Sequence, residues 1–77
     1  MGAAAVLALQ AMLDEGVYTP EQQAWIHNAI GAAWRYTKVH MTDACAAFNQ
    51  AAVVAPDSVP GIAARCLAAE LCGQLPG

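Results

Sequence analysis

The chain has 77 residues and a net charge of −3, and 58% of its residues are hydrophobic while 12% are charged. This length allows one domain, so residues 1–77 are expected to form a single unit. With only three basic residues, Arg35, Lys38 and Arg65, the composition argues against nucleic-acid binding, and its apolar character argues against a disordered tail.

The first predicted helix covers residues 3–15 and ends at Gly16, because glycine commonly follows the last turn of a helix. Val6, Leu9 and Leu13 recur at helical spacing and share one face, with polar residues off that face. The pattern is typical of an ordinary amphipathic helix with one buried side.

The second predicted helix covers residues 20–38 and has the clearest start signal in the chain. Thr19 is a natural N-cap, Pro20 fits the first helical position, and Gln22 completes a capping box of the T-x-x-Q form. The helix is therefore expected to begin at Pro20.

The two tryptophans of this helix should point in opposite directions. Trp25 and Trp34 are nine positions apart, and a helix turns by about 100° per residue. The helix is then either covered on two sides or presents one tryptophan to a partner.

The third predicted helix covers residues 43–55, starts at Thr42 or Asp43 as the cap, and stops before a proline. Asn49 and Gln50 are the only polar residues of its interior, so it should be buried on more than one side.

The fourth predicted helix covers residues 59–72, with Asp57-Ser58 as its cap, Pro60 in its first turn and Gly73 as its end. No segment of the sequence alternates as a strand would. Short loops favour antiparallel neighbours, so the fold class is all-α. It is expected to be either a compact four-helix bundle or a set of helical hairpins.

One stretch resembles a known helical repeat. Ala44, Phe48, Ala51 and Pro56 are spaced by four, three and five residues, and Ala32 precedes them at a matching position. Residues 31–56 thereby resemble one unit of the tetratricopeptide repeat. Membership would imply a helical scaffold that binds peptides or helices.

The sequence departs from that repeat at several positions. Gly31 stands where the repeat usually has leucine, and Arg35 where it usually has tyrosine. The turn at Val39-His40 lacks the usual glycine. The resemblance names no functional residue in this chain.

The three cysteines, Cys45, Cys66 and Cys72, form no C-x-x-C pair, and an odd count cannot close entirely into internal disulfides. They are expected to be reduced thiols used as small hydrophobic residues, which favours a cytoplasmic location. A membrane span is not expected, because no run approaches about 20 apolar residues. A secretory signal is not supported either, since the first residues carry no basic charge.

No pattern of residues indicates catalysis. His40, Asp43 and Cys45 lie close together but match no structural zinc spacing, and neither Cys45 nor His27 has a local partner that suggests a nucleophile and base. We therefore expect no enzyme activity, no metal and no cofactor.

The low charge density suggests that part of the surface is apolar, and such surface usually marks a contact with another molecule. We expect a small non-enzymatic protein-interaction module, an adaptor or inhibitor, that also forms a homo-oligomer. The apolar excess is expected away from the first helix, and the candidate partner-binding residues are Trp25, Trp34, Val53 and Val54.

Two alternatives remain open at this point. The first is a helical oligomer that binds or sequesters a small, nucleotide-like ligand, as a phage-encoded counter-defence protein would. Its candidate ligand-binding residues are Asn28, Arg35, Tyr36 and Lys38, because arginine pairs with phosphate or carboxylate and an aromatic ring stacks on a base. The second is a minor structural subunit of a larger complex.

Overall fold

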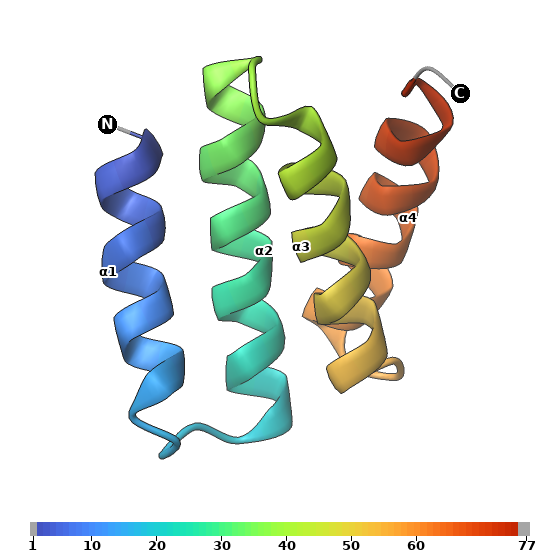
Figure 1. The fold of residues 1–77 in the computed structure, drawn as a ribbon. Coiled ribbons are helices and arrows are strands. Elements are labelled where there is room, and N and C mark those ends of the chain that lie inside the picture. The colour runs from blue at the N-terminus through green and yellow to red at the C-terminus, as the bar shows by residue number, and fades with distance from the viewer. Residues whose placement is uncertain (1, 76–77) are drawn as a thin grey trace.

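The computed structural model describes residues 2–75, and within them the chain forms helices and no strand (Figure 1). The helices are α1 (Gly2–Asp14), α2 (Pro20–Thr37), α3 (Met41–Val54) and α4 (Val59–Gly73). This confirms the predicted all-α fold of four short antiparallel helices. The predicted bounds differ from the observed ones by at most two residues.

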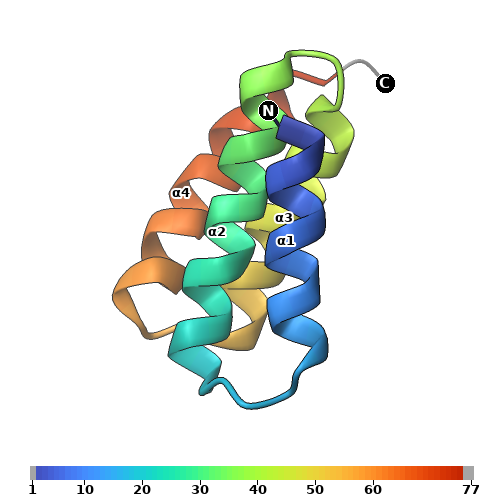
Figure 2. The same ribbon diagram turned by 90° about the vertical axis from the view of Figure 1, so that its left-hand side faces the viewer.

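The helices lie in two layers. Seen edge-on, α1 and α3 are on one side and α2 and α4 on the other (Figure 2). The extents of 36 × 29 × 16 Å fit this arrangement, because packed helices lie about 8–10 Å apart. The thin molecule therefore has two broad faces, each formed by two helices with a third helix beneath them.

Local capping explains three of the helix ends. The Thr19 hydroxyl accepts a hydrogen bond from the Gln22 backbone N–H, and the Gln22 side chain accepts one from the Thr19 N–H, which is the predicted capping box. Gly16 ends α1 with a φ of +70°, a conformation that glycine adopts without strain. Ser58 caps α4 by accepting from the Gly61 N–H at 3.1 Å.

The start of α3 was predicted wrongly. The helix begins at Met41, and Asp43 lies in its first turn instead of capping it. The turn before it is held by Thr37, whose hydroxyl accepts hydrogen bonds from the N–H groups of Val39 and His40. Lys38 ends α2 in the left-handed conformation, with a φ of 61°.

Two groups of buried side chains hold the layers together. The larger group joins α2, α3 and α4 around Phe48, and the smaller joins α1 to α2 through Val6, Ile26 and Ile30. Trp34 is half-buried and packs against both groups, so it connects them. Trp25 is the exposed tryptophan, with 54% of its surface open to solvent.

The cysteine prediction is corrected by the structure. Cys45 and Cys72 form a disulfide that joins α3 to α4, with 5.4 Å between their Cα atoms. Antiparallel packing brings these residues together although 27 positions separate them in the sequence, so their spacing gave no sign of the bond. Cys66 is a free, exposed thiol.

The outer side of α1 is also more apolar than an ordinary amphipathic helix would be. Leu7 is 68% exposed, and the alanines around it are exposed as well. The expectation that the apolar excess lies elsewhere is therefore incomplete. Within the described residues, no helix is both long enough and apolar enough to cross a bilayer.

Candidate binding groove

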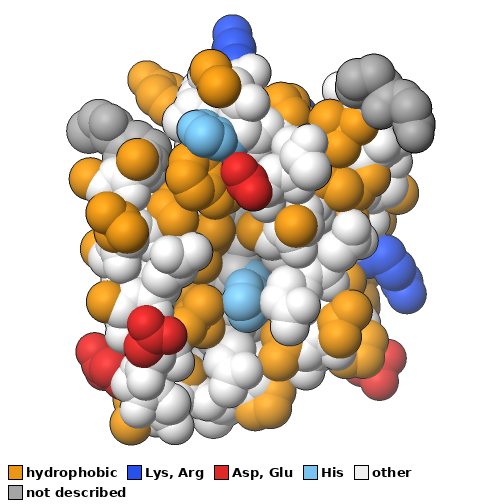
Figure 3. All heavy atoms as spheres, viewed as in Figure 1, with side chains coloured by type: hydrophobic (Ala, Val, Ile, Leu, Met, Phe, Trp, Pro, Cys, Tyr) orange, Lys and Arg blue, Asp and Glu red, His pale blue; other side chains and the backbone are white. Residues whose placement is uncertain are grey.

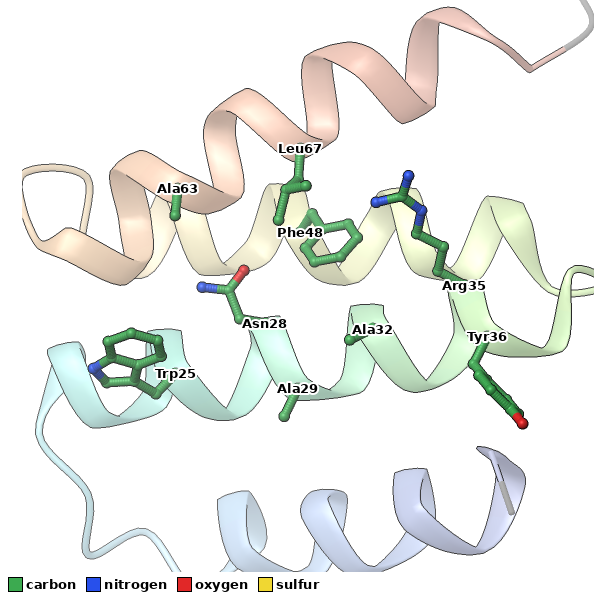
Figure 4. Close-up of a pocket in the computed structure, with 9 residues that line it drawn as sticks. All are labelled: Trp25, Asn28, Ala29, Ala32, Arg35, Tyr36, Phe48, Ala63 and Leu67. Atoms are coloured by element: carbon green, nitrogen blue, oxygen red, sulfur yellow. The ribbon is translucent and has the colours of Figure 1, made fainter.

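An open groove of about 580 Å³ runs between α2 and α4 (Figure 4). We call it the α2/α4 groove. It is lined by Trp25, Asn28, Ala29, Ala32, Arg35, Tyr36, Phe48, Ala63 and Leu67.

The floor of the α2/α4 groove comes from α3. The Phe48 ring lies between α2 and α4 and is only 2% exposed. Gly31 permits this position, since a Cβ on Gly31 would lie 2.8 Å from the Phe48 ring. The glycine that departs from the repeat pattern thus lets an aromatic ring contact the backbone of α2.

Small residues on both walls keep the groove open. Ala29 and Ala32 come from α2, and Ala63 comes from α4. Leu67 points from α4 toward Phe48 and adds the main aliphatic side chain of the wall (Figure 4). The resulting surface is concave and mainly apolar, as binding pockets commonly are.

Asn28 lies between the two walls of the groove (Figure 4). Its Nδ2 donates a hydrogen bond of 2.8 Å to the carbonyl oxygen of Pro60, which ties α2 to the first turn of α4. Its Oδ1 is enclosed and has no hydrogen-bond partner among the described residues. The hydrogen bond to Pro60 makes Asn28 a link between α2 and α4, and its enclosed oxygen is not accessible to a ligand.

Arg35 is the charged residue of the groove lining. It reaches from α2 toward α4 at the end of the groove opposite Trp25 (Figure 4). Within residues 2–75, the one close contact between a basic and an acidic side chain joins His40 Nδ1 to Asp43 Oδ2, so Arg35 has no carboxylate partner there. The groove therefore carries an unpaired cation beside an apolar surface.

The structure brings together some of the predicted site residues and separates others. Trp25 from the partner-binding set lines the same groove as Asn28, Arg35 and Tyr36 from the ligand-binding set. Tyr36 is 77% exposed and points away from Phe48 (Figure 4). These four residues, one from the first set and three from the second, belong to one surface.

The remaining predicted residues lie elsewhere. Trp34 is half-buried, and its ring centroid lies 4.4 Å from that of His40, with the two ring planes tilted by 50°. Val54 packs against the larger buried group around Phe48. Val53 is 73% exposed but does not line the groove. Lys38 caps α2 beyond the groove.

Sequence reasoning missed Leu67 and Ala63 as groove residues. They are four positions apart and share one face of α4, which is a detectable signal. Their role depends on α4 lying beside α2, and no local pattern specifies that neighbour.

A smaller groove of about 260 Å³ lies on the opposite face, between α1 and α3. Figure 3 looks onto this face and shows histidine side chains, in pale blue, at its surface. His27 lines the groove together with Gln10, Gln50 and Asp43. Burial lowers the pKa of His27 below its usual value of 6.5, because desolvation disfavours the charged ring.

The stability of the fold should consequently depend on His27 in mild acid. The unfolded chain binds a proton at a higher pH than the folded chain does, so the free energy of unfolding should fall as the pH drops below about 6.5. Urea unfolding between neutral pH and pH 5 measures this. His27→Gln should remove the His27 contribution to the fall, and His40→Gln should retain it. Equal pH dependence in the wild type and His27→Gln would contradict the assignment.

The described residues hold no group of three or more His, Cys, Asp or Glu side chains that could bind a metal ion. The fold and the α2/α4 groove define a small all-α protein with a concave apolar surface. The chain matches no family model, and no curated protein or solved structure is significantly similar to it. The resemblance to a tetratricopeptide unit therefore stays a prediction.

Proposed function

We propose that the protein is a small non-enzymatic interaction module, an adaptor or inhibitor, that holds an amphipathic helix of a protein partner in the α2/α4 groove. The observation that carries this proposal is the groove itself, with its apolar walls and its floor at Phe48. Helix-in-groove recognition depends on this combination of a hydrophobic channel and a few anchoring side chains.

The shape of the groove favours a helix as the occupant. The walls α2 and α4 run in the same direction, and α3 lies beneath them in the opposite direction (Figures 1 and 2). A helix above the groove would contact both walls opposite α3 and complete a four-helix arrangement around Phe48. Alanines on the walls allow such a helix to approach closely.

Trp25 is the expected anchor of the interaction. It is half-exposed at one end of the groove, and exposed tryptophan is enriched among residues that dominate binding energy. Trp34 cannot serve in the same way without disturbing the interior, because it packs against both buried groups.

Arg35 favours a partner that carries an acidic residue. An unpaired guanidinium at the end of an apolar groove favours a carboxylate on the occupant, and such a pair can be bidentate. The partner helix should therefore carry apolar residues along one face and an acidic residue at one end of it.

The small-ligand alternative uses the same groove but is less well supported. Arg35 and Tyr36 could contact an anionic aromatic ligand, yet the enclosed oxygen of Asn28 is out of reach and Lys38 lies outside the lining. A nucleotide-like ligand would meet one cation on a predominantly apolar surface.

Variants of the groove test the proposal. Trp25→Ala should weaken partner binding about thirtyfold, since an aromatic anchor contributes roughly 2 kcal/mol. Leu67→Glu should abolish binding by placing a charge in the apolar channel. Affinity capture from cells of the source, quantified by mass spectrometry, measures both effects.

Val53→Glu is the matched control, because Val53 is exposed and lies outside the groove. It should leave capture unchanged. A partner lost with Val53→Glu and retained with Leu67→Glu would place the interaction on α3 and overturn the assignment.

The cytoplasmic location stays a prediction, and the Cys45–Cys72 disulfide argues against it. Disulfides persist mainly in oxidising compartments, and the prediction depended on reduced thiols.

A further inference from the structure

We infer that one occupant of the α2/α4 groove is the outer face of α1 from a second copy of this chain. This inference rests on the proposed function, because it uses the same groove, and it names the partner. Two surfaces support it, the outer face of α1 and the α2/α4 groove. Neither is covered within one copy, and they match in charge and in length.

The outer face of α1 is apolar along its length and acidic at its end. It consists of Ala3, Ala4, Leu7, Ala11 and Asp14, which lie at helical spacing along one side. Leu7 and Asp14 are seven positions apart, so they are separated by about 10 Å along the helix axis. A single large side chain thus projects between small ones.

The groove has the complementary form. Asn28 and Arg35 are also seven positions apart on α2, and therefore about 10 Å apart along its axis. When Asp14 of a second copy lies beside Arg35, Leu7 lies near the level of Asn28. Between that level and Arg35, Ala32 adds only a small side chain to the wall, and Leu67 and Phe48 offer apolar contact (Figure 4).

The charges favour the alignment that places Asp14 beside Arg35. Asp14 lies in the last turn of α1, at the negative end of its helix, and that turn has no basic residue. Neither Asp14 nor Arg35 belongs to an ion pair in the part of the chain that the structure describes. Bringing them together pairs two charges that lack partners within one copy, and it places a cation at the end of the helix where cations are favoured.

The contact joins two different surfaces, so each copy offers both a donor helix and a groove. Two copies can exchange both contacts reciprocally, or successive copies can associate head to tail. In either case, association requires both the outer face of α1 and the groove.

Charge reversal tests the inference in solution. Sedimentation equilibrium of the full chain, from micromolar to millimolar concentration, should show self-association. Asp14→Arg and Arg35→Glu should each weaken it at least about tenfold, because each places like charges together. Mixing these two variants should restore association, since the arginine introduced at position 14 of one then meets the glutamate introduced at position 35 of the other.

Matched controls carry the same charge changes away from the contact. Asp57→Arg has the net charge of Asp14→Arg, and Arg65→Glu has that of Arg35→Glu; neither Asp57 nor Arg65 lines the groove. Both controls should self-associate as the wild type does. A wild type that stays monomeric over the whole range, or a mixture of Asp14→Arg and Arg35→Glu that fails to associate, would overturn the inference.

Leu7→Glu separates this inference from the proposed function. Leu7 is 68% exposed, so the substitution should spare the fold while it abolishes self-association. Capture of a foreign partner should persist in Leu7→Glu and disappear in Leu67→Glu. If self-association survives Leu7→Glu, the inference fails while the groove retains its proposed function. If Leu67→Glu leaves both kinds of binding intact, the groove is not the binding site and both proposals fail.

Discussion

Phe48→Ala should cost the fold a large share of its stability. The ring is 2% exposed, contacts α2 at Gly31 and lies among buried residues of α2, α3 and α4. Truncating a buried phenylalanine costs about 4 kcal/mol, from lost burial and from the cavity left behind. Domains of this size are stabilised by only about 4–12 kcal/mol in total, so the substitution should remove at least about a third of the stability. Urea unfolding followed by circular dichroism measures the loss.

Phe48→Leu is the informative companion, because leucine refills most of the space and should cost much less than alanine. Val53→Ala, at an exposed position on the same helix, should change stability by less than about 0.5 kcal/mol. A loss below about 1 kcal/mol for Phe48→Ala would show that the three helices are not organised around this ring.

Removing the disulfide should have the second largest effect on stability. The Cys45–Cys72 bond closes a loop with a sequence separation of 27, and restricting the unfolded chain by such a loop stabilises the fold by about 3.5 kcal/mol. The double variant Cys45→Ser/Cys72→Ser should therefore unfold at a markedly lower urea concentration than the oxidised wild type.

Cys66→Ser is the control for this measurement, since Cys66 is free and exposed. It should match the wild type under oxidising conditions, and it should lose stability with the wild type when a reductant is added. An oxidised wild type that is no more stable than the double serine variant would contradict the predicted contribution of the bond.

Local signals explain why the helices were predictable. The capping box at Thr19 and the left-handed glycine at Gly16 depend on residues within one turn of each other, and both appear where the sequence indicates. The start of α3 was not predictable in the same way. Thr37 holds the preceding turn from the end of another helix, although Asp43 has the chemistry of a cap.

The candidate site was predicted only in part, because it depends on which helices are neighbours. The sequence placed Trp25 and Trp34 on opposite sides of one helix, and the packing of α1 and α3 decided that Trp34 is the covered one. Leu67 could be recognised as apolar, but its contact with Phe48 requires α4 to lie beside α2. The disulfide was missed for the same reason.

The placement of the disulfide leaves the two ends of the molecule unequally secured. The covalent bond and the Asn28–Pro60 hydrogen bond both fasten α4, whereas no side-chain hydrogen bond in the described part of the chain connects α1 to another helix. Packing of Val6 on Ile26 and Ile30 therefore holds α1 in place. Local opening at this edge exposes few residues and breaks no covalent loop, so α1 is the segment that can detach while the rest stays folded. The same helix would then be free to exchange between copies, as in domain swapping.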